Sequence, residues 1–287
     1  MRRSLIIAMF LLPLALHAQL LWEISGKGLP QSSYLFGTDD NVPVTFLDSV
    51  PGLFRCYNDC QTVVGEVVVD EAETIARMTN AAHMQQSIRN VLSESEFNMV
   101  DSALRAEMNL PLTSVAMMRP AMIRSMYEMT LMERLFPAMK EDGGMDSFFQ
   151  RVARRQHIPV VGLEEIDDQI ELMFRTIGIE RQSKMLVGAV MAAAGKKEAL
   201  QRRGAMYRAG NIEGIYEETV RDTSEYAMTE GERFLMYGSR NAEWVERIAE
   251  LVGEKPCFIA VNVMHLPGEE GLIRLLEEKG YRVRAVK

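Results

Sequence analysis

Short apolar runs alternate with long helical stretches along this chain. Five runs rich in Val, Ile, Leu and Phe are typical of strands, and the first four read as buried on both faces: 33–38, 62–69, 158–165, 257–266 and 281–286. Helical periodicity fills roughly 70–156 and 167–253. Proline and glycine break these stretches at Pro111, Pro120, Pro137, Gly143, Gly144 and Gly210. The pattern predicts an α/β fold in which helix outweighs strand.

The end of the chain gives the clearest unit. An apolar strand over 257–264 leads into a Pro-Gly turn, an amphipathic helix over 269–279 and a last strand over 281–286. This order predicts a βαβ-type unit, with His265 just past its first strand. Because ligands collect at the carboxyl ends of strands in α/β sheets, His265 is a candidate functional residue.

Acidic side chains stand at or near the ends of three other predicted strands. Asp39 and Asp40 follow the first run, Glu66 belongs to the second, and Glu164 ends the third. Each of them also fits an ordinary helix N-cap or turn residue. Glu66 differs because it lies within an apolar run, where a buried carboxylate needs a partner or a metal ion.

Composition narrows the class of protein. With 287 residues, of which 47% are hydrophobic, the chain is long enough to bury a substantial core. A net charge of -8 and a pI near 5.2 argue against a nucleic-acid partner, which needs clustered Lys and Arg.

The first residues have the layout of a secretory leader. Arg2 and Arg3 precede an apolar stretch over 5–16, and the small Ala18 comes before Gln19. The stretch is shorter than the ~20 residues that span a bilayer, so we expect no permanent membrane anchor. We predict that residues 1–18 are a cleaved signal peptide and that residues 19–287 form one domain exported to a periplasm or the cell exterior.

Sulfur-containing residues leave two questions open. Cys56 and Cys60 lie close enough in sequence to pair across one turn, with Cys257 as a buried thiol. Many of the 21 methionines fall in 108–139, where we expect flexible core filling, with an adaptable peptide groove as the alternative.

Four blocks of the sequence, in this order, resemble the landmarks of the TraB/GumN family: LLWEISGKGLPQSSYLFGT, VVGLEEIDDQIELM, SRNAEWVERIAELV and VMHLPGEEGLIRLLEEKGYRV. That family is related to the Tiki metalloproteases and, more remotely, to ChaN-like haem-binding and erythromycin-esterase-like proteins. The resemblance implies an α/β fold with two small β-sheets in pseudo-repeated halves, surrounded by many helices.

The resemblance also implies a site. Tiki-branch members hold a metal ion with two Gly-x-x-His motifs and glutamates on neighbouring strands. In this chain the first motif falls on Gly37 to Asp40, with Asp in place of His, and the second on Asn262 to His265, without its Gly. The remaining matches are the two glutamates and an Arg-Asn pair: Glu66, Glu164, Arg240 and Asn241.

Two hypotheses follow from these matches. In the first, a metal-dependent hydrolase acts on a peptide or protein, and the metal ligands are Asp40, Glu66, Glu164 and His265. Such an oxygen-rich set suits Mn²⁺, Mg²⁺ or Ca²⁺ better than zinc, and the expected cofactor is a divalent ion such as Mn²⁺ or Co²⁺. Glu164 would be a ligand or the general base, and Arg240 would stabilise the oxyanion. Flanking residues are Asp39, Asn241 and Asn262.

In the second hypothesis, a non-catalytic protein binds a peptide, a metal ion or haem on the same scaffold. The pair Asp39 and Asp40, in place of a histidine motif, favours this alternative. The sequence gives no indication of the oligomeric state.

Overall fold

The computed structural model describes residues 19–68, 71–137 and 144–287. The predicted leader over 1–18 therefore lies outside the described residues. Within the described part of the chain, no helix has the length and apolar character that crossing a membrane requires.

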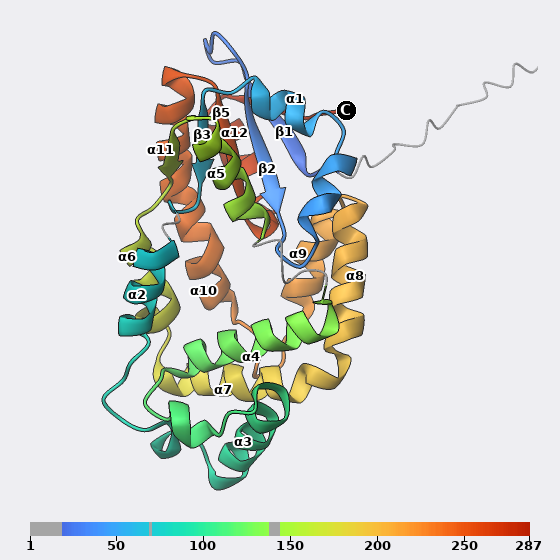
Figure 1. Ribbon diagram of the computed structural model, residues 1–287. Helices are drawn as coiled ribbons and strands as arrows, with labels where there is room; N and C mark the ends of the chain where they lie inside the picture. The colour runs from blue at the N-terminus through green and yellow to red at the C-terminus, as the bar shows by residue number, and fades with distance from the viewer. Residues whose placement is uncertain (1–18, 69–70, 138–143) are drawn as a thin grey trace, which may run out of the picture.

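A mixed sheet of six strands forms the centre of the described chain (Figure 1). Its order is β4-β3-β5-β2-β1-β6, with bounds Leu21–Ser25 (β1), Ser33–Thr38 (β2), Thr62–Gly65 (β3), Val160–Gly162 (β4), Cys257–Asn262 (β5) and Arg282–Ala285 (β6). The first four strands in that order are parallel to one another, whereas β1 is antiparallel to both β2 and β6.

The α/β class predicted from the sequence is confirmed, but the expectation of two small sheets is wrong. The described strands form one sheet because β5 pairs in parallel with both β2 and β3. Strands from the two halves of the chain therefore interleave. The pattern also missed β1, whose charged Glu23 interrupts its apolar positions.

The βαβ-type unit at the end of the chain is confirmed. After β5 come a short 3₁₀ turn, η8 (Val263–His265), then α12 (Leu272–Glu278) and β6. Since β2 is parallel to β5 and β1 is antiparallel to both β2 and β6, β6 runs parallel to β5. The two strands of the unit are separated in the sheet by β2 and β1.

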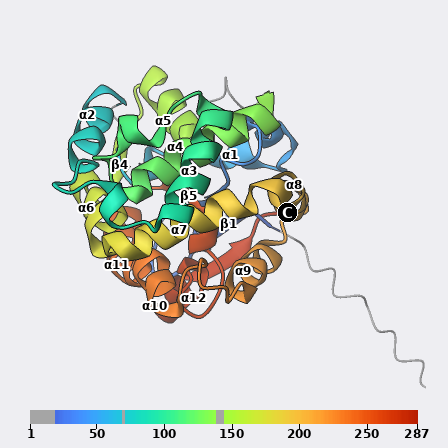
Figure 2. The same ribbon diagram turned by 90° about the horizontal axis from the view of Figure 1, so that it is seen from below.

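The helices form two groups (Figures 1 and 2). Around the sheet lie α1 (Leu53–Asn58), α5 (Met145–Arg155), α11 (Ser239–Glu254) and α12. A second layer lies beyond the end toward which β2 points: α3 (Glu94–Met108), α4 (Pro120–Leu135) and α7 (Ile179–Met191). The remaining helices connect these groups: α2 (Glu71–Ala81), α6 (Ile166–Glu171), α8 (Lys196–Arg208), α9 (Ile212–Arg221) and α10 (Glu230–Arg233).

Local sequence explains where several of these helices begin and end. Ser93 and Glu96 form a reciprocal capping box at the start of α3. Pro120 is the first residue of α4, where its missing N–H is not needed. Gly210, with φ of 62°, follows the end of α8 in a conformation that glycine adopts without strain.

Three hydrophobic clusters hold the described chain together. The largest surrounds the sheet, a second lies among α3, α4 and α7, and a small third one contains Ala82, Ile170 and Phe174. The expected core filling by the methionines of 108–139 is found only in part: Met108 and Met118 pack against the second cluster, whereas Met129 is 61% exposed. The buried residues of α4 are branched or aromatic, as in Ile123, Tyr127 and Leu131.

The three cysteines are buried free thiols. The Cys60 thiol donates to the carbonyl oxygen of Cys56 rather than bonding to its sulfur. Cys56 and Cys60 therefore do not form the disulfide that their spacing in the sequence allows.

Candidate functional site

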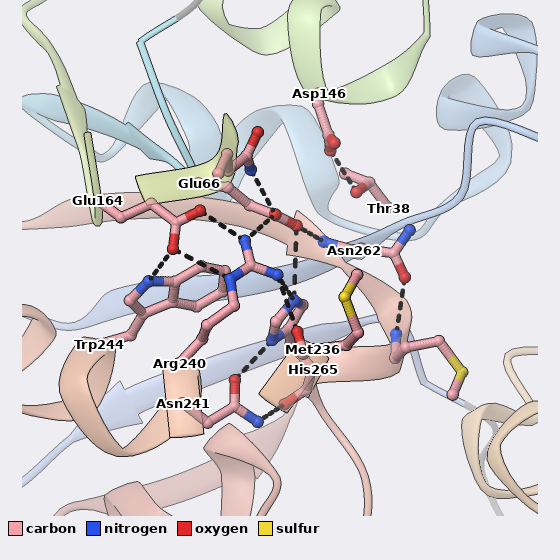
Figure 3. Close-up of polar contacts among 12 residues, drawn as sticks. Thr38, Glu66, Asp146, Glu164, Met236, Arg240, Asn241, Trp244, Asn262 and His265 are labelled. Carbon is pink, nitrogen blue, oxygen red and sulfur yellow. Dashed lines mark hydrogen bonds and ion pairs between the residues drawn. The ribbon is translucent and has the colours of Figure 1, made fainter. Parts of the chain in front are cut away.

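Four parallel strands bring the predicted site residues to one edge of the sheet. Asp39 and Asp40 follow β2, Glu66 follows β3, Glu164 follows β4, and His265 follows β5 through η8. Glu66, Glu164 and His265 lie together there around one guanidinium (Figure 3). Glu66 stands one residue beyond the end of β3 rather than inside the strand.

Arg240, the second residue of α11, lies at the centre of this edge. Its guanidinium contacts both glutamates and the histidine (Figure 3). The acceptors are both carboxylate oxygens of Glu164 (3.0 and 2.7 Å), Oε2 of Glu66 (2.8 Å), Nε2 of His265 (3.1 Å) and the carbonyl oxygen of Met236 (3.0 Å). A guanidinium has five N–H donors, so this arrangement uses all of them.

Glu164 is held on two sides. Besides Arg240, the indole Nε1 of Trp244 donates to its Oε2 at 3.2 Å. Trp244 lies four residues after Arg240, one turn along α11, and its ring stacks under the guanidinium at 4.4 Å. Both oxygens of Glu164 are therefore engaged within the protein.

Asn241 fixes the tautomer of His265. The Asn241 amide nitrogen donates to the carbonyl oxygens of His265 and Glu270, at 3.1 and 2.7 Å. Its oxygen therefore faces Nδ1 of His265 at 2.6 Å and accepts that proton. Because Arg240 donates to Nε2, the imidazole is neutral, with its proton on Nδ1.

Burial and charge agree with this neutral form. His265 is 1% exposed, and burial together with Arg240 lowers its pKa to about 4, against the opposing effect of Glu66. Burial alone would raise the pKa of Glu66. A protonated His265 would oppose that rise. The Arg240 guanidinium and the N–H of Asn262, 2.9 Å from Oε1, also oppose it, so the pKa of Glu66 lies below its usual value. Glu66 is thus a carboxylate beside a neutral imidazole.

This arrangement predicts acid sensitivity. The pKa of His265 falls from 6.5 in a free side chain to about 4 in the protein, so the unfolded chain binds the proton more readily. The contribution to stability is complete above pH 6.5 and is lost as the pH falls toward 4. Between pH 7.5 and 4.5, we expect the free energy of unfolding to drop by about 2 to 3 kcal/mol more in the wild type than in His265→Gln. Urea unfolding at both pH values checks this, and equal pH dependence of the two proteins would refute it.

A second group of carboxyls lies on the other side of Glu66. Asp40, Glu66 and Asp146, the second residue of α5, line a cavity of about 230 Å³ together with Gln150 and Gln169. Asp40 Oδ1 accepts the N–H of Met145, and Asp146 accepts the hydroxyl proton of Thr38 (Figure 3).

The pKa values of these carboxyls move in the opposite direction from that of Glu66. Burial and then the charges of Glu66 and Asp40 raise the pKa of Asp146 well above its usual value. Burial also raises the pKa of Asp40, as do Asp39 and Glu66, although the N–H of Met145 opposes this. One cavity therefore contains carboxyls that favour different protonation states.

Asp39 and Asn262 have structural contacts. Asp39 is fully buried, accepts from Arg203 Nε at 2.8 Å and also accepts the N–H of Asn41 at 2.9 Å. Asn262 caps η8 by accepting the N–H of Met264 at 3.0 Å. Gly37, which opens the first motif, lies so close to η8 that a Cβ there would be 2.9 Å from Leu266.

Comparison with known proteins identifies the family. Residues 20–285 match the TraB/PrgY/gumN family. The chain belongs to the TraB/PrgY/gumN family. Neither the curated proteins nor the solved structures contain a significant match to this chain.

The resemblance of this TraB/PrgY/gumN chain to Tiki proteases led us to expect a metal ion. The four predicted ligands, as they are arranged, do not fit one. Glu66, Glu164 and His265 all bond to Arg240, so a divalent cation would have to displace a guanidinium. In the described ranges, no three His, Cys, Asp or Glu side chains converge closely enough to bind a metal ion.

The sequence alone did not indicate several residues of this TraB/PrgY/gumN site. Asp146 enters from a helix start rather than a strand end, and Gln169 donates to Glu66 from α6 at 3.3 Å. Trp244 was available as a signal, because its spacing of four residues from Arg240 puts both on one helical face.

Proposed function

We propose that this protein is a hydrolase of peptide-like bonds whose reacting groups are Asp40 and Asp146. The observation that carries the proposal is the cavity in which these two carboxyls, both with raised pKa values, face the ionised Glu66. Neighbouring carboxyl groups that are held by different contacts are the usual basis for acid and base roles. The resemblance to Tiki proteases supports hydrolysis as the reaction class. Because residues 1–18 resemble a secretory leader, we propose that the activity lies outside the cytoplasm.

The two aspartates differ in how they are held. Asp40 accepts an N–H at the start of α5, which favours its ionised form. Burial of Asp146, together with the negative charges of Glu66, Asp40 and Asp39, favours its protonated form. We therefore assign Asp40 as the general base and Asp146 as the general acid.

The proposed reaction has two steps. Asp40 takes a proton from water as the water oxygen bonds to the carbonyl carbon, and Asp146 gives its proton to the carbonyl oxygen. The resulting tetrahedral diol then collapses: Asp40 gives its proton to the leaving nitrogen, the C–N bond breaks, and Asp146 recovers a proton from a hydroxyl. Atoms and charge balance, and both carboxyls return to their starting states.

Arg240, Glu164 and His265 have a positioning role in this proposal. With all five donors engaged, Arg240 has none left for an oxyanion, and both oxygens of Glu164 are likewise bonded. Their effect on the reaction goes through Glu66, which Arg240 holds ionised and which in turn raises the pKa of Asp146.

A second candidate function is binding without turnover. It is favoured because three of the predicted metal ligands, Glu66, Glu164 and His265, bond to Arg240 instead. The carboxyls of the cavity favour a cationic ligand. Haem is a poor fit, because His265 is buried and both its ring nitrogens are bonded.

A peptide library tests the choice between the two. We expect the protein to cleave members of a pooled library of short peptides, read by mass spectrometry, and to do so equally well with and without a chelator. The matched control is Asp146→Asn, which should leave the library intact. Cleavage abolished by the chelator and restored by Mn²⁺ would contradict the carboxyl mechanism, and binding without cleavage by the wild type would favour the second candidate.

A further inference from the structure

A large cavity lies next to the hydrogen-bond network of Arg240 and His265 but apart from the two reacting aspartates. Its volume is about 790 Å³, and its walls come from α9, from the π-helical turn η7 (Phe234–Gly238) and from the segment 264–270. Asn241, which bonds His265, forms part of its wall. It shares no lining residue with the cavity of Asp40 and Asp146.

The π-helical turn brings aromatic rings to this cavity. It interrupts the otherwise continuous helix formed by α10 and α11, and such turns occur frequently at functional sites. Phe234 and Tyr237 of this turn, with Tyr216 of α9, line the cavity. Phe234 is 45% exposed, so part of its ring is accessible to a ligand.

Carboxylates dominate the charge of the same walls. Glu230, Glu269 and Glu270 line the cavity with a single cation, Arg233, whose guanidinium donates to the carbonyl oxygen of Met228. Glu269 is 92% exposed, with Arg274 no closer than 3.9 Å. Glu270 lies against Gly238, where a Cβ would be 2.4 Å from its Oε2.

We propose that this cavity binds a Lys or Arg side chain of a peptide. Aromatic faces attract a cationic head group, carboxylates neutralise its charge, and the ring surfaces also cover its aliphatic stem. The volume lies within the usual range for small-ligand sites. The proposal stands whether or not the protein cleaves the peptide, because it concerns a different set of residues.

Calorimetry with three capped tripeptides tests this proposal. The probes are acetyl-Ala-Arg-Ala-amide and its counterparts with norleucine or Glu in the middle position. We expect the Arg peptide to bind about tenfold more tightly than the norleucine peptide and the Glu peptide not to bind measurably.

Four variants locate the binding. Phe234→Ala and Glu230→Gln should each weaken binding of the Arg peptide by about threefold to tenfold. The controls replace exposed residues of the same types elsewhere: Phe54→Ala on α1 and Glu180→Gln on α7. Both should leave the affinity for the Arg peptide unchanged. Equal affinity for the Arg and norleucine peptides, no binding of either, or binding indifferent to Phe234 and Glu230 would each overturn the proposal.

Discussion

Replacing Arg240 with methionine is expected to lower the free energy of unfolding by about 3 to 5 kcal/mol, because the change leaves buried charges without a partner. The side chains of Glu66 and Glu164 are only 14% and 10% exposed, and Arg240 is the cation that each of them contacts at 2.8 and 2.7 Å. Methionine fills a similar volume but donates no hydrogen bond. Arg240→Lys should recover only part of the loss, since one ammonium cannot satisfy acceptors arranged around a planar guanidinium.

Chemical denaturation of Arg240→Met beside Arg274→Met checks this expectation. Arg274 is 52% exposed and pairs with Glu278 at 2.8 Å, so its replacement should cost no more than about 1 kcal/mol. A triple variant, Arg240→Met with Glu66→Gln and Glu164→Gln, should be more stable than Arg240→Met alone, because no unpaired charge remains buried. Similar losses for Arg240→Met and Arg274→Met would show that the network is not the stabilising element described above.

Asp146→Asn is expected to lower kcat/KM for any cleaved peptide by about 10²- to 10⁴-fold, the range typical of losing a general acid. Asparagine preserves the shape of the side chain and can still accept the hydroxyl proton of Thr38. It cannot deliver a proton to the carbonyl oxygen. The stability of the variant should be unchanged or higher, because the amide, like the protonated carboxyl, carries no charge beside Glu66 and Asp40, and folding no longer has to favour protonation there.

The proposed role also gives a pH dependence for the wild type. Asp146 must be protonated to act as the acid, so the rate should fall as the pH rises through its raised pKa. Asp48→Asn, at an exposed aspartate of η1 (Val44–Ser49), is the control and should retain the wild-type rate. Cleavage by Asp146→Asn at the wild-type rate would remove Asp146 from the mechanism.

Much of the site could be predicted because a simple topological rule governs it. Parallel strands present their carboxyl ends at one edge, so residues that follow separate apolar runs meet in space. That rule places Asp40, Glu66, Glu164 and His265 at one edge of the sheet, although they are far apart in the sequence. The shared edge does not depend on the order of the strands, whereas contact between particular side chains does.

The strand order and the partner of each side chain depend on contacts that no local pattern contains. The insertion of β5 between β2 and β3 turns two expected sheets into one. Arg240 lies on a helix, and its reach into the space between two glutamates and a histidine follows from the packing of α11 against the sheet edge. Asp146 follows a glycine-rich break and begins a helix, a position where an acidic residue usually serves only the helix end.

Metal binding by residues 19–287 tests most directly the central claim that a guanidinium, rather than a metal ion, occupies the centre of this site. Elemental analysis of the purified protein and calorimetry with Mn²⁺, Co²⁺ and Zn²⁺ should show no stoichiometric binding. The matched variants are Glu66→Ala and His265→Ala. One equivalent of metal bound by the wild type and lost in both variants would contradict the claim and restore the four-ligand site.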